Sequence, residues 1–266
     1  MREAKASYKP VNAVLRSLEV LAAVNRLRGQ ATVGELHRET ALDKATIVRM
    51  LETLMAAGYV CRDDEVARYE VTGKTLLLSA GYDRHRAVGR LVAPLLARFR
   101  NDIGWPSDLA IFDRDAMLVV ETSREAGPLL VNRHPGYRAP ILATSLGLAY
   151  LAFTGPEERA AVLACEAGEA APWNELFRDP RRAKAAFARV RARGYATMHD
   201  DYSRLEYRHQ ISAVGVPVLA EGRAIAAMNV LFLKSVLPAA AAATSLVPAL
   251  QAAAAEIAGV LAATAD

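Results

Sequence analysis

The stretch TVGELHRETALDKATIVRMLETLMAAGYVCRDDEVARYEV, from Thr32 to Val71, decides the fold of the first part of this chain. Its signals predict a short helix, a tight turn, a second helix and a small hairpin. Thr32 and Glu35 have the spacing of a capping box, in which each side chain satisfies a backbone N–H at the start of a helix. The inward face of this short helix is expected to consist of Val33, Leu36, Ala41 and Leu42.

The second helix is expected to run from Lys44 to Ala57. Asp43 is a favourable N-cap for it, and Gly58 is placed to end it. Apolar residues at three- and four-residue intervals predict its buried face, which comprises Ile47, Val48, Leu51, Leu54 and Met55. The polar side chains outside that face are those of Lys44, Thr46, Arg49 and Glu52.

Two short alternating runs, 59–62 and 67–71, surround a polar turn at 63–65 and predict an antiparallel hairpin. Two helices followed by a hairpin form a winged helix-turn-helix, whose second helix enters the major groove of DNA. The expected DNA contacts are Lys44, Thr46 and Arg49 on this helix, Arg62 and Arg68 on the hairpin, and Lys5 in the leading arm 1–10. The alternative is an ordinary pair of packed helices that never touches DNA.

Charge does not decide between these alternatives. The chain has a net charge of +4 and a pI near 9.1. Residues 1–72 nevertheless hold 11 basic and 10 acidic residues, so the electrostatic footprint of a DNA-binding surface is local.

The chain has 266 residues, a mass of 28.7 kDa and 53% hydrophobic residues, which favours two domains with sizeable cores. The Ala-rich segment 236–255 contains two prolines and few bulky apolar residues, so we interpret it as a helix of a soluble protein and expect no membrane span. Residues 1–10 have no apolar segment of signal-peptide type behind them, and a cytoplasmic location is expected. Cys61 and Cys165 lie far apart in sequence, which argues against a disulfide framework.

A helix over 11–27 is expected to close the core of the winged domain, which then spans 11–73. Its inward face is predicted to comprise Val14, Leu15, Leu18, Leu21, Ala22 and Val24. Linker helices follow over 74–103, with a break near Ala80 and Gly81. Their apolar residues exceed what one small domain covers, so they are expected to pack either on a second subunit or on the C-terminal domain.

The pattern changes to period two after Trp105, which marks a further domain over 104–266. Strands are predicted on either side of a turn at 113–115, over 128–133, and over 211–220 and 224–233 around a turn at 221–223. Helices are predicted over 145–153, 156–165, 180–193 and about 238–263. Strands in hairpins with helices gathered to one side indicate an antiparallel α+β domain.

An enzyme is not expected. The sequence has no G-x-S-x-G, no H-E-x-x-H and no P-loop, and its glycines do not form a dinucleotide site. His134, His199 and His209 with the acids at 200–201 match no tight metal-ligand spacing, so neither a metal nor a cofactor is expected. A ligand-sensing or protein-interaction module that does not bind DNA remains the alternative function.

Four blocks together resemble the IclR family of transcriptional regulators. They are LRSLEVLAAVNRL (15–27), TVGELHRETALDKATIVRMLETLMAAGYV (32–60), GYRAPILATSLGLAYLAF (136–153) and ISAVGVPVLAEGRAIAAMNV (211–230). The resemblance implies a winged helix, a helical linker and a GAF-like effector-binding domain. It also implies a double-stranded DNA operator as partner and a homodimer or dimer of dimers. Segments 105–122 and 131–142 most resemble regulators of 3-(3-hydroxyphenyl)propionate and related aromatic acid catabolism.

The resemblance implies a small effector, often a carboxylate, bound around Thr144, Ser145 and Leu146. A physical reason is independent of the family, because a loop that turns into a helix offers free backbone N–H groups and the positive end of the helix dipole. Simple N-capping by Thr144 or Ser145 is the alternative, and the two roles are compatible. His134 and Arg138 precede this turn and are candidates to complement an acid.

Matching the late strands to the family adds four candidate effector contacts. Asp201 falls where a polar contact is common, and Ala213 falls where a small side chain leaves room for a ligand. Leu109 and Met228 are expected to form an apolar wall suited to an aromatic ring. The alternative for these four is an ordinary place in the core or in a loop.

Overall fold

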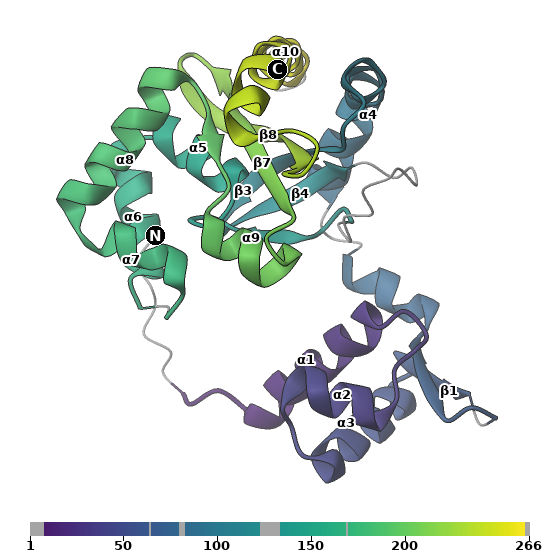
Figure 1. Cartoon of the computed structure of the whole chain (residues 1–266). Helices are drawn as coiled ribbons and strands as arrows, with labels where there is room; N and C mark the ends of the chain where they lie inside the picture. Colours follow the sequence, from purple (N-terminus) through teal and green to yellow (C-terminus); the bar gives the residue numbers. More distant parts are fainter. Residues whose placement is uncertain (1–7, 64, 80–82, 123–133, 169, 264–266) are drawn as a thin grey trace. The chain divides into compact units, whose positions relative to one another are not determined.

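The computed structural model describes residues 8–63, 65–79, 83–122, 134–168 and 170–263. The chain divides into two compact units, Met1–Asp83 and Arg84–Asp266. The α+β architecture predicted from the sequence is confirmed, with a helix-turn-helix and hairpin first and an antiparallel sheet with helices second (Figure 1).

The first unit is the predicted winged helix-turn-helix. Its elements are α1 (Asn12–Arg26), α2 (Val33–Thr40), α3 (Lys44–Ala56), β1 (Val60–Asp63), β2 (Arg68–Val71) and the 3-10 helix η1 (Gly73–Ser79). Strands β1 and β2 pair antiparallel from Val60 opposite Val71 to Asp63 opposite Arg68. Every predicted helix and strand of this unit forms within one residue of its expected bounds.

Local hydrogen bonds explain why α2 and α3 begin where they do. The Thr32 hydroxyl accepts a hydrogen bond from the Glu35 N–H at 3.2 Å, and the Glu35 carboxylate accepts one from the Thr32 N–H at 2.9 Å. The Thr32 N–H, and then the Thr32 hydroxyl, donate to the Glu35 carboxylate and lower its pKa. Asp43 accepts from the Thr46 N–H at 2.8 Å and so caps α3. The capping box and the N-cap predicted from the sequence are confirmed.

The core of the first unit is smaller than the sequence pattern predicted. Its buried hydrophobic residues are Val20, Leu21, Ala23, Val24, Ala31, Leu36, Ile47, Leu51, Leu54, Val60 and Tyr69. Only the second half of α1 contributes, so the prediction that its first half faces inward was wrong. Val14, Leu15 and Leu18 are 55%, 54% and 55% exposed, because the rest of the unit covers only the later turns of the helix.

Three further inward predictions in this unit were also wrong, and one of them is Ala22, which is exposed on α1. Ala41 is exposed because it holds the left-handed conformation, with φ 54°, that turns the chain between α2 and α3. Val48 lies at the edge of the apolar face of α3 and is 37% exposed. Helical periodicity identifies the stripe but not how much of it the neighbouring helices cover.

The second unit contains a six-stranded antiparallel sheet in the order β5-β4-β3-β8-β7-β6. The strands are β3 (Ser107–Asp113), β4 (Ala116–Thr122), β5 (Arg138–Pro140), β6 (Ala196–Thr197), β7 (Ile211–Ala220) and β8 (Arg223–Leu233). The helices are α4 (Asp83–Ile103), α5 (Ser145–Phe153), α6 (Pro156–Glu166), η2 (Pro172–Asn174), α7 (Glu175–Arg178), α8 (Pro180–Arg193), α9 (Asp200–Tyr207) and α10 (Ala239–Ala262).

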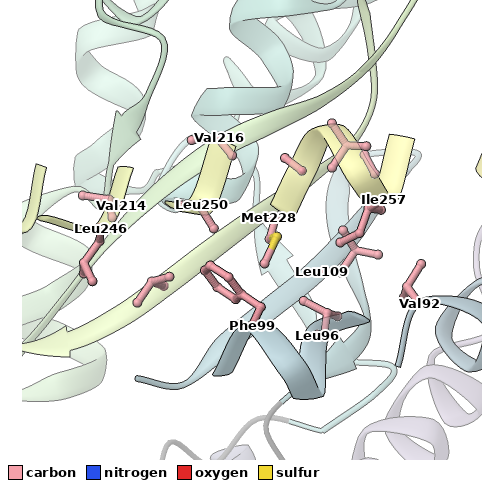
Figure 2. Packing of buried hydrophobic residues seen from close by; sticks show 14 of the residues in the cluster. Val92, Leu96, Phe99, Leu109, Val214, Val216, Met228, Leu246, Leu250 and Ile257 are labelled. Atoms are coloured by element: carbon pink, nitrogen blue, oxygen red, sulfur yellow. The ribbon is translucent and has the colours of Figure 1, made fainter. Parts of the chain in front are cut away.

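Helices α4 and α10 cover one face of this sheet (Figure 2). Leu96 and Phe99 of α4 pack with Leu250 of α10 against Met228 and its neighbours in the sheet. Gly89 allows α4 to approach β4 closely, since a Cβ at this position would meet the carbonyl oxygen of Val120 at 2.5 Å. Of the two alternatives for the predicted linker, packing on the C-terminal unit is observed for α4.

The opposite face of the sheet is covered by α5, with α8 packed outside it. Successive residues of β8 therefore belong to different cores: Met228 and Val230 face α10, whereas Ala227 and Leu231 face α5 and α9. This strict alternation follows from the two-residue period of a strand. This alternation determines which side chains of β8 lie on the same face of the sheet as α5.

Some elements of the second unit differ from the prediction. The strand predicted over 128–133 lies outside the described residues, and so does the predicted break near Ala80 and Gly81. On the edge away from β3, the described partner of β4 is the three-residue β5. Strands β5 and β6, η2, α7 and α9 were not predicted, because such short elements carry little periodic signal.

Helix α10 is the one described helix that is long and apolar enough, by length and composition, to cross a membrane. The same composition is typical of a helix in the core of a protein. Ala242, Leu246, Leu250, Ala254 and Ile257 of α10 are buried in the core on the sheet. One face of α10 therefore belongs to the core on the sheet.

The start of α5 depends on a glycine. A Cβ at Gly147 would lie 1.9 Å from the carbonyl oxygen of Ile141, whereas nothing lies within 4 Å of a Cβ at Gly259 in α10. We expect Gly147→Ala to lower the free energy of unfolding by about 3 kcal/mol, because the backbone has to move. The matched change Gly259→Ala should raise it by about 0.5–1 kcal/mol, because alanine favours a helix. Calorimetric unfolding of both variants checks this, and equal effects would contradict the close approach.

Candidate nucleic-acid interface and effector site

The outer surface of α3 carries the predicted DNA contacts. Lys44 and Arg49 are exposed, and among the described residues neither is in an ion pair. The Thr46 hydroxyl donates a hydrogen bond to the Asp43 carboxylate at 2.6 Å, which makes Thr46 part of the helix cap. This bond is also the largest cause of the lowered pKa of Asp43. Two free cations on a capped helix can bind phosphates or base edges.

The same surface of α3 exposes residues that the sequence analysis did not include among the contacts. Ala45 and Val48 are exposed beside Lys44 and Arg49. Small apolar side chains in the major groove contact the methyl group of thymine. The signal was present in the sequence, since Val48 lies at the border of the apolar stripe, but it was interpreted as core.

The hairpin carries the other two described DNA-contact candidates. The guanidinium of Arg62 lies 5.9 Å from the centre of the Tyr69 ring, and Arg68 is half-buried at the start of β2. Lys74, which was not predicted, donates a hydrogen bond to the carbonyl of Ala57 at 2.8 Å and so ties η1 to the end of α3. Lys5 lies outside the described residues.

Thr144 begins α5 in the way that the capping alternative predicted. Its hydroxyl accepts a hydrogen bond from the Gly147 N–H at 3.2 Å and donates one to the carbonyl of Pro140 at 2.9 Å. The side chain is therefore fully used in the cap. Leu146 is buried in the core beside α5, so neither side chain is free to bind a ligand. The first-turn N–H groups of α5 keep the positive end of the helix dipole at this place.

Ser145 differs from its neighbours because its hydroxyl is buried without a hydrogen-bond partner. It lies against β7, where a Cβ at Gly215 would meet the carbonyl oxygen of Ser145 at 2.7 Å. Asn229 is opposite Gly215 in the register of β7 and β8. The Asn229 side-chain oxygen accepts from the Asp108 N–H at 3.0 Å, and its Nδ2 has no partner. Two unsatisfied buried groups thus lie on one face of the sheet.

A small apolar cluster adjoins this polar pair. It consists of Ala143, Met198, Tyr202, Ala213 and Leu231, with Trp173, Tyr207 and Ile211 packed against it. Backbone bonds hold it together, because the His199 N–H donates to the Ala143 carbonyl at 2.9 Å and the Met198 N–H to the Ala213 carbonyl at 3.0 Å. The structure therefore brings the predicted residues Ala213, Ser145 and Thr144 together.

Helix α9 places Asp201 near this cluster, but its carboxylate has other partners. It forms an ion pair with Arg204 and lies 3.6 Å from the Nδ1 of His199. His199 caps α9 by accepting the Asp201 N–H at 3.2 Å. Burial lowers the pKa of His199, which favours the neutral ring that this acceptor role requires.

Four of the predicted effector contacts do not join the site. Leu109 and Met228 face α4 and α10 on the opposite side of the sheet, so the prediction that they line the same cavity was wrong. The period of a strand fixes alternation but not which face meets α5. Arg138 forms ion pairs with Asp113 and Asp115 at the β3–β4 turn, and His134 is exposed before β5.

The site around Ser145 can bind an anion without a cationic side chain. It offers the Nδ2 of Asn229, the hydroxyl of Ser145 and the start of α5, with the rings of Tyr202 and Trp173 close by at 5.4 Å from each other. Among the described residues no cluster of His, Cys, Asp or Glu is suited to hold a metal ion. Asn229 was not predicted, although a lone amide within the apolar strand AIAAMNVLFL was a usable signal.

Comparisons with known proteins match both the helix-turn-helix unit and the second unit of the chain. A model of the IclR helix-turn-helix domain matches residues 13–64, and a model of the C-terminal part of the bacterial transcriptional regulator IclR matches residues 82–259. The Pca regulon regulatory protein of Pseudomonas putida is 25% identical over 222 residues, which cover 83% of this chain and 74% of that protein. The acetate operon repressor of Salmonella typhimurium is 24% identical over 195 residues, with 73% and 71% covered.

Solved structures share the fold over nearly the whole chain. The crystal structure of Thermotoga maritima IclR matches with a TM-score of 0.64 and 20% identity, covering 94% of this chain and 98% of that one. An IclR homolog from Microbacterium hydrocarbonoxydans, crystallised with 4-hydroxybenzoate, matches with a TM-score of 0.63 and 22% identity, covering 94% and 99%. Since the C-terminal model alone matches well over half of the chain, the protein belongs to the IclR family of bacterial transcriptional regulators.

Proposed function

We propose that this regulator recognises an operator through α3 and that an aromatic carboxylic acid, bound at Ser145 and Asn229, changes its affinity for that operator. The observation that carries the proposal is the pair of buried polar groups without partners, Ser145 Oγ and Asn229 Nδ2. A buried polar group without a hydrogen bond costs about 1–3 kcal/mol. A ligand that satisfies both groups removes this cost.

The class of effector follows from the chemistry of the site. The amide Nδ2 of Asn229 donates hydrogen bonds, and the start of α5 favours negative charge, which together suit a carboxylate. The adjoining cluster supplies the rings of Tyr202 and Trp173 and the small side chain of Ala213, which suit an aromatic ring. A structural neighbour was crystallised with 4-hydroxybenzoate, and a relative is named for the Pca regulon, which supports an aromatic acid and a role in aromatic catabolism.

DNA recognition is assigned to specific side chains of the first unit. In this proposal Arg49 and Val48 contact base edges and Lys44 binds a phosphate, which their exposure on α3 supports. Arg62 and Arg68 of the hairpin add contacts to the DNA backbone. Thr46 contributes through its cap and its methyl group, because its proton is donated to Asp43. This role places the protein in the cytoplasm with its operator.

We further propose that the working form is a homodimer. Helix-turn-helix proteins bind two half-sites as symmetric dimers. The N-cap and first half of α1 expose Val11, Val14, Leu15 and Leu18, which recur at three- and four-residue intervals and form one stripe. A second copy of the same helix would cover this stripe, since residues in a symmetric interface meet their own counterparts. Pairing of two dimers into a tetramer is compatible with this arrangement.

The role of Arg49 predicts a clear loss of DNA binding. Arg49→Ala should weaken operator binding by about 1–3 kcal/mol, because a base contact is lost, and should also reduce discrimination against a scrambled duplex. Arg16→Ala is the matched control, since Arg16 is an exposed cation on α1. Gel-shift titration with the operator fragment measures both variants. Equal affinities for Arg49→Ala and Arg16→Ala would contradict the assignment of α3.

The effector site is tested by removing a hydroxyl that has no partner. Ser145→Ala should leave the unliganded protein as stable as the wild type or slightly more so, because no hydrogen bond is lost. The same variant should lose the thermal shift that an aromatic carboxylate causes. A ligand at a hundredfold excess over its dissociation constant stabilises the wild type by about 2.7 kcal/mol. Thermal unfolding with 4-hydroxybenzoate, hydroxyphenylpropionates and hydroxycinnamates provides the measurement.

Ser107→Ala is the control for this experiment, because the buried hydroxyl of Ser107 accepts a hydrogen bond from Arg100 at 3.0 Å. We expect this variant to lose about 1 kcal/mol of stability and to keep its thermal response. If Ser145→Ala unfolds more easily than Ser107→Ala, or if it still responds to the ligand that stabilises the wild type, the site is assigned wrongly.

The dimer surface is tested by adding charge to the stripe of α1. The double change Leu15→Glu and Leu18→Glu should convert the protein to smaller species in light scattering, because carboxylates cannot be buried in an apolar interface without partners. The fold of the first unit should persist, as both side chains are more than half exposed. Val66→Glu is the control, since Val66 is 51% exposed in the hairpin turn. An unchanged mass for the double variant would contradict this interface.

A further inference from the structure

Helix α8 carries an unusual concentration of positive charge. Its 14 residues include six basic side chains and no acidic one: Arg181, Arg182, Lys184, Arg189, Arg191 and Arg193. The whole chain has 33 basic and 29 acidic residues. Without α8 it would have 27 basic residues against the same 29 acidic ones, and its net charge would be negative. This one helix therefore supplies all of the net positive charge of the protein.

Five of the six cations of α8 lie in two rows on the exposed side of the helix. Ala183, Phe187 and Val190 are buried and fix the inner face. At 3.6 residues per turn, one row lies on one side of this inner face and consists of Lys184 and Arg191. The other row lies on the opposite side and consists of Arg182, Arg189 and Arg193. Residues seven positions apart in a row are about 10 Å apart along the axis. The outermost crest between the rows consists of Ala185, Ala188 and Ala192, with Arg181 at its N-terminal end, and all four are exposed.

Carboxylates do not neutralise this surface within the described part of the chain. Arg191 donates to the carbonyl of Ala152 at 2.9 Å, and Arg193 donates to the carbonyl of Tyr195 and lies over its ring. Such neutral partners orient the guanidinium groups but do not neutralise their positive charge.

The side chains of Arg181, Arg182, Lys184 and Arg189 are exposed and form no ion pair with a described residue. The nearest acid in the chain, Asp179, accepts the backbone N–H groups of Arg181 and Arg182 at the start of the helix. On the neighbouring α6, burial and the charge of Arg191 lower the pKa of Arg159.

We propose that the exposed face of α8 binds the phosphate backbone of duplex DNA without sequence preference, as a second DNA contact separate from α3. Five of the six cations are arginines, whose guanidinium groups match phosphate oxygens in two-point hydrogen bonds. A crest of alanines lets the helix approach closely while both rows reach phosphates on either side. The major groove is wide enough to admit a helix.

Other polyanions fit this surface less well. A helix that binds a membrane surface inserts large apolar side chains, but the apolar face of α8 is already buried in the core and its crest holds only alanines and Arg181. A protein interface is built around buried aromatic or bulky apolar anchors, which the exposed side of α8 lacks. The choice of DNA also rests on the proposed function, because a regulator bound at its operator has duplex DNA at hand.

The test uses the full-length protein with its recognition helix disabled. The changes Lys44→Glu and Arg49→Glu remove sequence-specific binding, and fluorescence anisotropy then measures residual binding to a random-sequence duplex at low salt. In this background we add Arg182→Gln, Lys184→Gln and Arg189→Gln. We expect affinity to fall about tenfold or more and the slope of log K against log salt to become shallower by about 2–3, since each lost phosphate contact contributes about 0.9.

A second triple variant controls for net charge. Arg90→Gln, Arg114→Gln and Arg208→Gln remove three exposed cations elsewhere in the same unit. Equal losses in the two triple variants, or no residual binding before they are introduced, would overturn the proposal. Competition by poly-glutamate at the same charge concentration as the duplex would also overturn it, in favour of an acidic protein partner. The preference of the wild-type protein for its operator over a random duplex is measured separately. A failure of the proposed function is thereby distinguished from a failure of this inference.

Discussion

The close approach of α5 to the sheet is the constraint on which the proposed effector site depends. Two glycines permit it, because a Cβ at Gly147 would collide with the Ile141 carbonyl and one at Gly215 would collide with Ser145. With the first turn of α5 seated on β7, the Ser145 hydroxyl has no room to reach water. The same contact brings the helix N-terminus beside Asn229. The packing of α5 on the sheet is otherwise apolar, but it buries the polar side chains of Ser145 and Asn229 inside the second unit.

The sequence predicted those features that depend on near neighbours in the chain. The caps at Thr32 and Asp43, and the hairpin formed by β7 and β8, follow from residues a few positions apart, and all are observed. Burial depends on elements far away in sequence and was less predictable. The periodicity of α1 identified an apolar stripe, but Leu15 and Leu18 remain exposed because the rest of this unit does not reach them.

The candidate site shows the same limit. Thr144 and Ser145 were found because a helix start is visible in sequence, whereas Leu109 and Met228 were placed on the wrong face of the sheet. A strand pattern gives two faces without saying which one meets α5. Asn229 was missed because a single amide in an apolar strand gains meaning only when Gly215 and Ser145 are known to lie beside it. The presence of one amide side chain in an otherwise apolar strand was nonetheless a signal that the sequence offered.

The energetics of the site set the size of the response that an effector can cause. A ligand shifts a conformational equilibrium only by the difference in its affinity for the two states. Two buried polar groups without partners cost about 1–3 kcal/mol each, and on our proposal a carboxylate recovers that cost only in the conformation that holds Ser145 against β7. This difference is comparable to a typical allosteric coupling free energy of about 1–3 kcal/mol. On our proposal, a neutral hydroxyl and an amide supply this coupling, and no buried arginine or lysine is required to bind the acid.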